Sequence, residues 1–271
     1  MGITMPRTPL SQIPTLSNDQ GINDKILTEI CQSKGTLKKL HLGCGETLFP
    51  DYINIDFPPS QHNVMTVVPD AYADLKNTSL LPNSIDEIRS HHLFEHFNRV
   101  FALSMLIKWH ECLKPGGSLV IETPDIMGCA RTLVSNGDLK VQTGIVRHLA
   151  GDQAADWAYH LDHWFPDRFN FTLSTLGFSD VSAKTSQWPH EPFLSNVTAQ
   201  AIKTENLSRN ELVARAFEIL KYSMVASVET PTWSVWCQQL EDALSEAPTA
   251  PIQSTNEVEQ FSMRIPVALS T

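Results

Sequence analysis

The sequence lacks the features that mark secreted, membrane-spanning and zinc-knuckle proteins. Its five cysteines are odd in number and show no CxxC spacing, which argues against a disulfide framework and a zinc knuckle and predicts reduced, buried thiols. No apolar run is long enough to span a membrane, and the N-terminus lacks the apolar segment of a signal peptide. We therefore expect a cytoplasmic protein with no membrane partner.

Basic residues are also scarce. Lys and Arg total 20 against 30 Asp and Glu, which gives a formal net charge of −10. No basic cluster offsets this charge, so we expect no nucleic-acid partner. With 42% hydrophobic residues, a chain of 271 residues can form one large domain plus an extension.

Two apolar runs joined by a glycine turn form the most informative segment, KKLHLGCGETLFPDYINIDF at residues 38–57. The pattern predicts a strand, a turn at Gly43 and Gly45, and a second strand that ends on Asp56. In an open α/β sheet, glycines at the first strand's carboxyl end let a ligand approach the backbone, and an acid ending the next strand can bind ribose hydroxyls. We therefore expect a nucleoside-containing cofactor, and no full helix between these two strands.

The remaining pattern predicts a doubly wound α/β sheet with seven strands. Expected strands lie near residues 38–43, 52–56, 64–68, 86–91, 117–123, 179–185 and 196–204. Expected helices lie at 22–33, 100–113 and 167–176, after a capping box at 208–211, and at 233–244. Residues 124–165 are expected to form a long polar and aromatic excursion that helps build a binding site.

These elements divide the chain into three parts. Residues 1–20 are expected to form an irregular arm, residues 21–205 the cofactor-binding domain, and residues 206–271 a helical extension and tail. The C-terminal helices are expected to pack on the domain. A homodimer contact and a cover for the active site are the alternatives.

Several ordered segments resemble the class I S-adenosylmethionine-dependent methyltransferases, in particular their type 11-like small-molecule subgroup. Besides LHLGCG and INID, these segments are ADLKNTSLLPNSIDEIRSHHLFEHF, ECLKPGGSLVIETPD and LSTLGFSDV, and they run from Leu37 to Lys203. The resemblance implies a Rossmann-like sheet whose last two strands pair antiparallel. It also implies S-adenosylmethionine as the cofactor and methyl transfer to an O or N atom of a small molecule, such as a sugar or natural product.

The resemblance further implies where the cofactor lies. The residues implied to bind it are Gly43, Cys44, Gly45 and Glu46 at the methionine part, Asp56 at the ribose, Asp74 and Leu75 at the adenine, and Ser90 and His91 near the sulfonium. Many members carry an acid two residues before the first glycine, which helps to hold the cofactor's amino group. This chain has His41 there, and Glu46 is the residue that could compensate.

Histidines are the candidates for catalysis, because an acceptor hydroxyl must lose a proton and imidazole titrates near neutral pH. We select His92, which follows the fourth expected strand, and His160 and His163. The latter two lie in GDQAADWAYHLDHWF, which resembles the acceptor-side loop of type 11-like members. A structural role is the alternative for each.

His92, Glu95 and His96 could form a metal site, because their spacing would place nitrogen and oxygen donors on one helical turn. No further ligands are evident from the sequence, so we expect no metal. Glu95 is instead expected to favour the N-terminal end of the following helix through the helix dipole.

Three other functions use similar sequence features. The first is another group transfer, or a rearrangement, with the same cofactor. The second is a nicotinamide-dependent oxidoreductase, although Thr47 stands where the dinucleotide fingerprint has its third glycine. The third is a non-catalytic cofactor-binding protein, which the unusual His41 supports.

Overall fold

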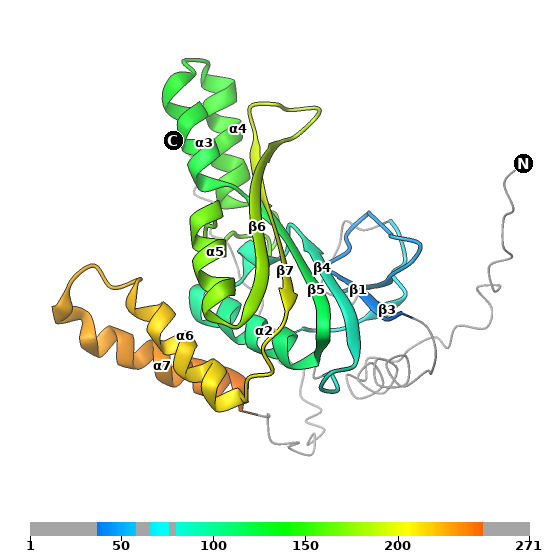
Figure 1. The fold of residues 1–271 in the computed structure, drawn as a ribbon. Helices are drawn as coiled ribbons and strands as arrows, with labels where there is room; N and C mark the ends of the chain where they lie inside the picture. The colour runs from blue at the N-terminus through cyan, green and yellow to red at the C-terminus, as the bar shows by residue number, and fades with distance from the viewer. Residues whose placement is uncertain (1–36, 58–65, 76–79, 246–271) are drawn as a thin grey trace, which may run out of the picture.

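The computed structural model describes residues 37–57, 66–75 and 80–245, and seven strands of this part form one sheet. The strand order is β3-β2-β1-β4-β5-β7-β6 (Figure 1). The strands are β1 (Lys39–Leu42), β2 (Ile53–Asp56), β3 (Ala71–Tyr72), β4 (Ile85–His91), β5 (Leu113–Pro124), β6 (Phe178–Gln187) and β7 (Ser195–Lys203). Strands β1 to β5 pair in parallel, and β7 pairs antiparallel with both β5 and β6. This topology is typical of the class I methyltransferase fold and confirms the predicted fold class.

The described helices include four that contribute to one main core with the sheet. The described helices are α2 (Arg99–Cys112), α3 (Ile126–Ser135), α4 (Leu139–Ala150), α5 (Pro166–Thr175), α6 (Arg209–Lys221) and α7 (Thr230–Leu244), with short 3-10 turns η2 (Phe94–His96) and η3 (Ser227–Glu229). Figure 1 shows α3 and α4 as a hairpin beyond the end of the sheet where β5 ends. The same figure shows α6 and α7 beside α2.

Alternation along the strands separates a buried face from a polar one. Leu42, Ile88 and Ile121 belong to the main core, together with residues of α2, α5, α6 and α7. The intervening residues point to the other face, because successive side chains of a strand alternate. His41 is there, next to its register partners Asn54 of β2 and Arg89 of β4. The sheet therefore presents polar side chains beside the predicted cofactor turn.

Several local predictions are confirmed. Residues 43–52, between β1 and β2, contain no helix. The helix expected at 100–113 is present as α2, and Asn98, which sequence analysis did not single out, caps it by accepting a hydrogen bond from the Phe101 N–H group. At the start of α6, the predicted capping box is complete: the Ser208 hydroxyl accepts from the Glu211 N–H group, and the Glu211 side chain accepts from the Ser208 N–H group. Each cap satisfies N–H groups that the helix itself leaves unpaired.

The predicted third strand is misplaced. Residues 64 and 65 lie outside the described residues, and residues 66–68 are not in a strand; Val68 is exposed. The strand starts only at Ala71, which pairs with Ile55. Pro69 explains the delay, because proline has no N–H group to donate to a strand ladder.

The excursion at 124–165 contains more regular structure than expected, because α3 and α4 both lie within it. Asp125 caps α3 and Asp138 caps α4 through side-chain oxygens that accept backbone N–H groups. Both caps are readable in the sequence as acids that precede apolar, helix-spaced residues. The predicted excursion therefore forms a helical hairpin followed by an irregular segment at 151–165.

The C-terminal helices pack on the domain, as expected. Leu212 and Leu220 of α6 and Leu240 of α7 are buried in the main core.

The expected arm, the helix at 22–33 and the tail from residue 246 lie outside the described residues. Cys44, Cys129 and Cys237 are free thiols, the first two buried, and the buried Cys112 thiol donates to the Trp109 carbonyl. Among the described helices, none has the length and apolar character needed to cross a membrane.

Candidate functional site

The glycine turn and Asp56 are directly joined. The Gly45 N–H group donates to Asp56 Oδ2 at 2.7 Å, and the Phe57 N–H group donates to Asp56 Oδ1 at 2.7 Å. Gly43 and Gly45 have φ of +63° and +51°, which glycine adopts without steric cost. Between them, Cys44 is buried, and burial raises the pKa of its thiol to about 12. The carboxylate is thus fixed against the turn, while Cys44 is a neutral packing residue.

Gly43 also touches the segment that follows β4. A Cβ atom at Gly43 would lie 2.9 Å from Leu93 Cβ, whereas a Cβ at Gly45 would meet nothing within 4 Å. Leu93 stands between His92 and Glu95 of the predicted catalytic region. The cofactor turn and the histidine segment are therefore packed against one another.

This packing gives a matched pair of variants. Gly43→Ala combines the left-handed strain, about 1–2 kcal/mol, with a clash against Leu93, so we expect a clear loss of both stability and S-adenosylhomocysteine affinity. Gly45→Ala carries similar strain without the clash and should lose less. Urea unfolding and calorimetry measure the two effects. Equal losses in the two variants would contradict a role for the Leu93 contact.

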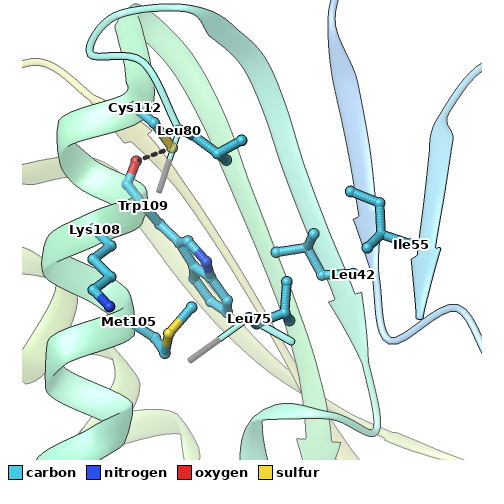
Figure 2. A pocket seen from close by; sticks show the side chains of 8 residues that line it. All are labelled: Leu42, Ile55, Leu75, Leu80, Met105, Lys108, Trp109 and Cys112. Atoms are coloured by element: carbon cyan, nitrogen blue, oxygen red, sulfur yellow. Dashed lines mark hydrogen bonds between the residues drawn. The ribbon is translucent and has the colours of Figure 1, made fainter. Parts of the chain in front are cut away.

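The predicted adenine end borders an apolar pocket, shown in Figure 2. About 370 Å³ of empty space, part of it open to solvent, lies between α2 and the strands β1 and β2. Its lining residues are Leu42, Ile55, Leu75, Leu80, Met105, Lys108, Trp109 and Cys112. Leu75 is the predicted cofactor residue among them, and Asp74 precedes it, half-buried. The lining is apolar apart from Lys108, and Leu75 links this pocket to the predicted adenine contact.

At the predicted methionine end, His41 lies in the interior. His41 is buried, its Nδ1 lies 3.2 Å from Asn54 Oδ1, and its ring packs on Phe49 and His91. Burial lowers the pKa of His41 to about 4, so the ring is neutral at pH 7. Glu46 accepts hydrogen bonds from the Thr66 N–H group and hydroxyl.

Ser90 and His91 point to opposite faces of the sheet, because they are consecutive residues of β4. Ser90 is fully buried on the core face, and its hydroxyl has no hydrogen-bond partner among the described residues. His91 is on the polar face, where its Nδ1 lies 3.6 Å from Glu122 Oε1. Of the two, His91 is the one beside His41 and the methionine end.

His92 leaves the strand in a left-handed conformation, with φ of +51°. Its Nδ1 is 3.2 Å from Glu95 Oε1, and its Nε2 is 3.2 Å from the amide oxygen of Asn196. Burial alone would lower the pKa of His92, but the hydrogen bond to Glu95 and the charges of Glu95 and Glu122 outweigh it and raise the pKa. Non-glycine residues rarely adopt this conformation. In His92 it places both ring nitrogens next to hydrogen-bond acceptors, which favours the protonated ring.

Glu95 brings the remaining histidines together. The residue is 1% exposed, and its Oε1 lies 3.9 Å from His160 Nε2. The rings of His96 and His160 are perpendicular, with centroids 4.7 Å apart. Burial would raise the pKa of Glu95, yet the hydrogen bond to His92 and the nearby histidines lower it. Burial lowers the pKa of His160 to about 4. The cluster thus joins a carboxylate to a neutral imidazole from a distant segment.

The expected dipole role of Glu95 is wrong. Helix α2 is capped by Asn98, and Glu95 turns into the interior instead.

His163 follows His160 by three residues and makes hydrogen bonds through its backbone. Its N–H group donates to Asp162, and its carbonyl accepts from Arg168. Of the three predicted catalytic histidines, the structure brings His92 and His160 together around Glu95.

Sequence reasoning missed the residues behind this cluster. Asn196 of β7 accepts from Trp188 Nε1 and His92 Nε2, both at 3.2 Å, and its amide nitrogen donates to His148 Nε2 at 3.0 Å. Glu122 Oε1 lies 3.7 Å from His92 Nε2. These residues come from β5, α4 and the β6–β7 pair. The sequence offered one signal. Glu122 lies near the end of the expected strand 117–123, and Asn196 begins the expected strand 196–204.

Comparisons with known proteins find similar solved structures at low identity and no matching family. No protein-family model and no curated protein matches the chain. A candidate methyltransferase from Bacillus halodurans matches at 14% identity over 68% of this chain and 100% of its own, with a TM-score of 0.42. An S-adenosylmethionine-dependent methyltransferase from Methanosarcina mazei matches at 13% identity over 61% of this chain and 92% of its own, with a TM-score of 0.38.

A third similar structure is longer than this chain. Phosphoethanolamine N-methyltransferase 2 from Haemonchus contortus, bound to phosphomonomethylethanolamine and S-adenosylhomocysteine, matches at 14% identity with a TM-score of 0.37. The match covers 83% of this chain and about half, 49%, of that enzyme. Because the identities and TM-scores are this low, we take the function from the chain's own residues.

Proposed function

We propose that this chain transfers a methyl group from S-adenosylmethionine to an oxygen or nitrogen atom of a small molecule. The observation that carries the proposal is the Asp56 carboxylate, fixed at the end of β2 by two backbone N–H groups, one of them from the glycine turn. A carboxylate has about four acceptor sites, so two hydrogen bonds leave room for the two ribose hydroxyls. The position at the strand ends is where open α/β sheets bind nucleotides.

The chemistry requires alignment more than activation. A lone pair of the acceptor attacks the methyl carbon, the carbon–sulfur bond breaks, and its electron pair returns to the sulfur, which leaves S-adenosylhomocysteine. The methyl group is already activated by the sulfonium, so the protein has to orient the acceptor and remove its proton. Because Leu93 packs on Gly43, the cluster of His92, Glu95 and His160 is adjacent to the cofactor turn. We assign the acceptor to this side.

Roles within the cluster follow from protonation. Both ring nitrogens of His92 are in hydrogen bonds and its pKa is raised, which suits a residue that orients Glu95. His160 is neutral at pH 7, so the lone pair on its ring can accept a hydrogen bond or the proton from the acceptor hydroxyl. Tyr159, 44% exposed, offers an aromatic surface next to it. A small, hydroxyl-bearing acceptor fits this arrangement.

Two experiments test the proposal. Calorimetric titration should show one-to-one binding of S-adenosylhomocysteine and no binding of NAD. A screen of small-molecule acceptors with S-adenosylmethionine should then yield a product one methyl group heavier, and His160→Ala should lose most of that turnover while it keeps cofactor binding. Binding of NAD in place of S-adenosylhomocysteine would overturn the assignment.

His41 gives some support to a second candidate, a protein that binds the cofactor without methyl transfer. The buried, neutral ring occupies the place where the resembled family often has an acid for the cofactor's amino group. Tight binding of S-adenosylhomocysteine without turnover of any acceptor would favour this candidate. A product that gained a different group would point to other S-adenosylmethionine chemistry.

A further inference from the structure

Three donor side chains from two distant segments converge beside the acceptor side. Glu95 and His96 belong to η2, and His160 lies in the irregular segment 64 positions after His96. One ligand atom from each lies within 4.8 Å of the other two. The 3.9 Å from Glu95 Oε1 to His160 Nε2 is too long for a hydrogen bond. Two ligands of one ion, each about 2.1 Å from it, are roughly 3–4 Å apart.

The backbone holds the two segments in this arrangement. The Leu161 and Asp162 N–H groups both donate to the Glu95 carbonyl, at 2.8 and 3.3 Å. His96 Nδ1 is 3.1 Å from the Tyr159 carbonyl. A carbonyl oxygen only accepts, so Nδ1 carries the proton and Nε2 of His96 keeps the lone pair that a metal ion needs. Histidine ligands of metals are usually fixed by such a second hydrogen bond.

Two polar atoms of the cluster are buried without a partner. Glu95 Oε2 and His160 Nδ1 have no hydrogen-bond partner among the described residues. An unpaired buried polar atom is costly and rare in native proteins. Glu95 Oε1, by contrast, is already engaged by His92 Nδ1. The carboxylate is thus oriented through Oε1, which also faces His160 Nε2, while Oε2 lacks a hydrogen-bond partner among the described residues.

We propose that Glu95, His96 and His160 bind one divalent transition-metal ion of the Zn²⁺ type. Two imidazoles and one carboxylate suit Zn²⁺ and its first-row neighbours, whereas Mg²⁺ and Ca²⁺ prefer all-oxygen sets. Three protein ligands leave a coordination position open, as in catalytic zinc sites. The sequence alone indicated no metal because His160 is far from the other two ligands along the chain.

The open position suits an oxygen of the acceptor. A hydroxyl bound to such an ion loses its proton more readily, and His160 then acts through the ion rather than as a free base. This role rests on the proposed function, whereas the ion site itself does not. The Leu93–Gly43 contact keeps the site next to the cofactor turn.

The test uses the full chain, without a histidine tag and freed of metal by a chelator. Calorimetric titration with Zn²⁺ should show one site per chain, and Co²⁺ should give a visible absorption spectrum that reports its coordination. Glu95→Gln and His160→Ala should each weaken Zn²⁺ binding about a hundredfold or more, because each removes one of three ligands. His190→Ala is the matched control, since His190 is exposed in the β6–β7 turn.

The outcomes separate cleanly. One-to-one binding by wild type and His190→Ala, with weak binding by either ligand variant that still binds S-adenosylhomocysteine, supports the site. If one of the two ligand variants does not fold, His96→Ala takes its place, because His96 is the third proposed ligand. Absence of saturable binding by wild type, or equal binding by the ligand variants, overturns it. Zn²⁺ binding without S-adenosylhomocysteine binding would contradict the proposed function and still support the metal site.

Discussion

Asp56→Ala should weaken S-adenosylhomocysteine binding by about a hundredfold or more. Hydrogen bonds to a charged group contribute about 1.5–3 kcal/mol each, and the proposed ribose site has two. The variant also removes the acceptor of the Gly45 N–H group, so the turn proposed to receive the methionine part loses its support. Isothermal titration calorimetry measures the loss directly.

Asp51→Ala is the matched control for this prediction. Asp51 is exposed in the same connection between β1 and β2, so its removal should leave binding unchanged. Asp56→Asn keeps the shape of the side chain and should bind with intermediate affinity. If folded Asp56→Ala bound S-adenosylhomocysteine as wild type does, Asp56 would not be the ribose ligand.

Gly151→Ala should destabilise the fold by about 3 kcal/mol or more. Gly151 ends α4 with φ of +83° and ψ of +170°, a region that only glycine populates and that costs other residues about 1–3 kcal/mol. A Cβ atom there would also overlap the Ala158 carbonyl oxygen, which is backbone and cannot turn aside. Urea unfolding of the variant against wild type gives the difference in free energy.

The same substitution should disturb the site, because Gly151 begins the segment that carries His160. The His160 N–H group donates to the Ala150 carbonyl at 3.2 Å, so the segment closes directly on the end of α4. Gly137→Ala is the control: Gly137 is exposed, and a Cβ there meets nothing within 4 Å. A Gly151→Ala protein as stable as Gly137→Ala would show that the segment adapts freely.

Features set by neighbouring residues in the chain could be predicted from the sequence. The glycine turn, the strand that ends on Asp56 and the capping box at Ser208 each depend on a few consecutive residues, and each is present. The third strand was misplaced because the apolar character of Val67 and Val68 outweighed the proline that follows them. Pairing with β2 begins only at Ala71.

The site's interior could not be predicted in the same way. Glu95 was assigned to a helix end, because nothing in its own segment shows that the backbone of residues 161 and 162 donates to its carbonyl. Asn196 lies 104 positions from His92, and their contact depends on β7 being next to β5. Contacts of this kind follow from topology, and one sequence without related sequences does not report them.

The contact between Gly43 and Leu93 predicts that the two halves of the proposed site are thermodynamically linked. Leu93 packs on the glycine turn, so we expect a ligand that shifts the turn to shift the segment that holds His92 and Glu95. Whatever one ligand does to the affinity for the other, the effect must be reciprocal. A cofactor that tightens the turn thereby prepares the acceptor side. The coupling between cofactor and acceptor would then depend on one side chain, that of Leu93.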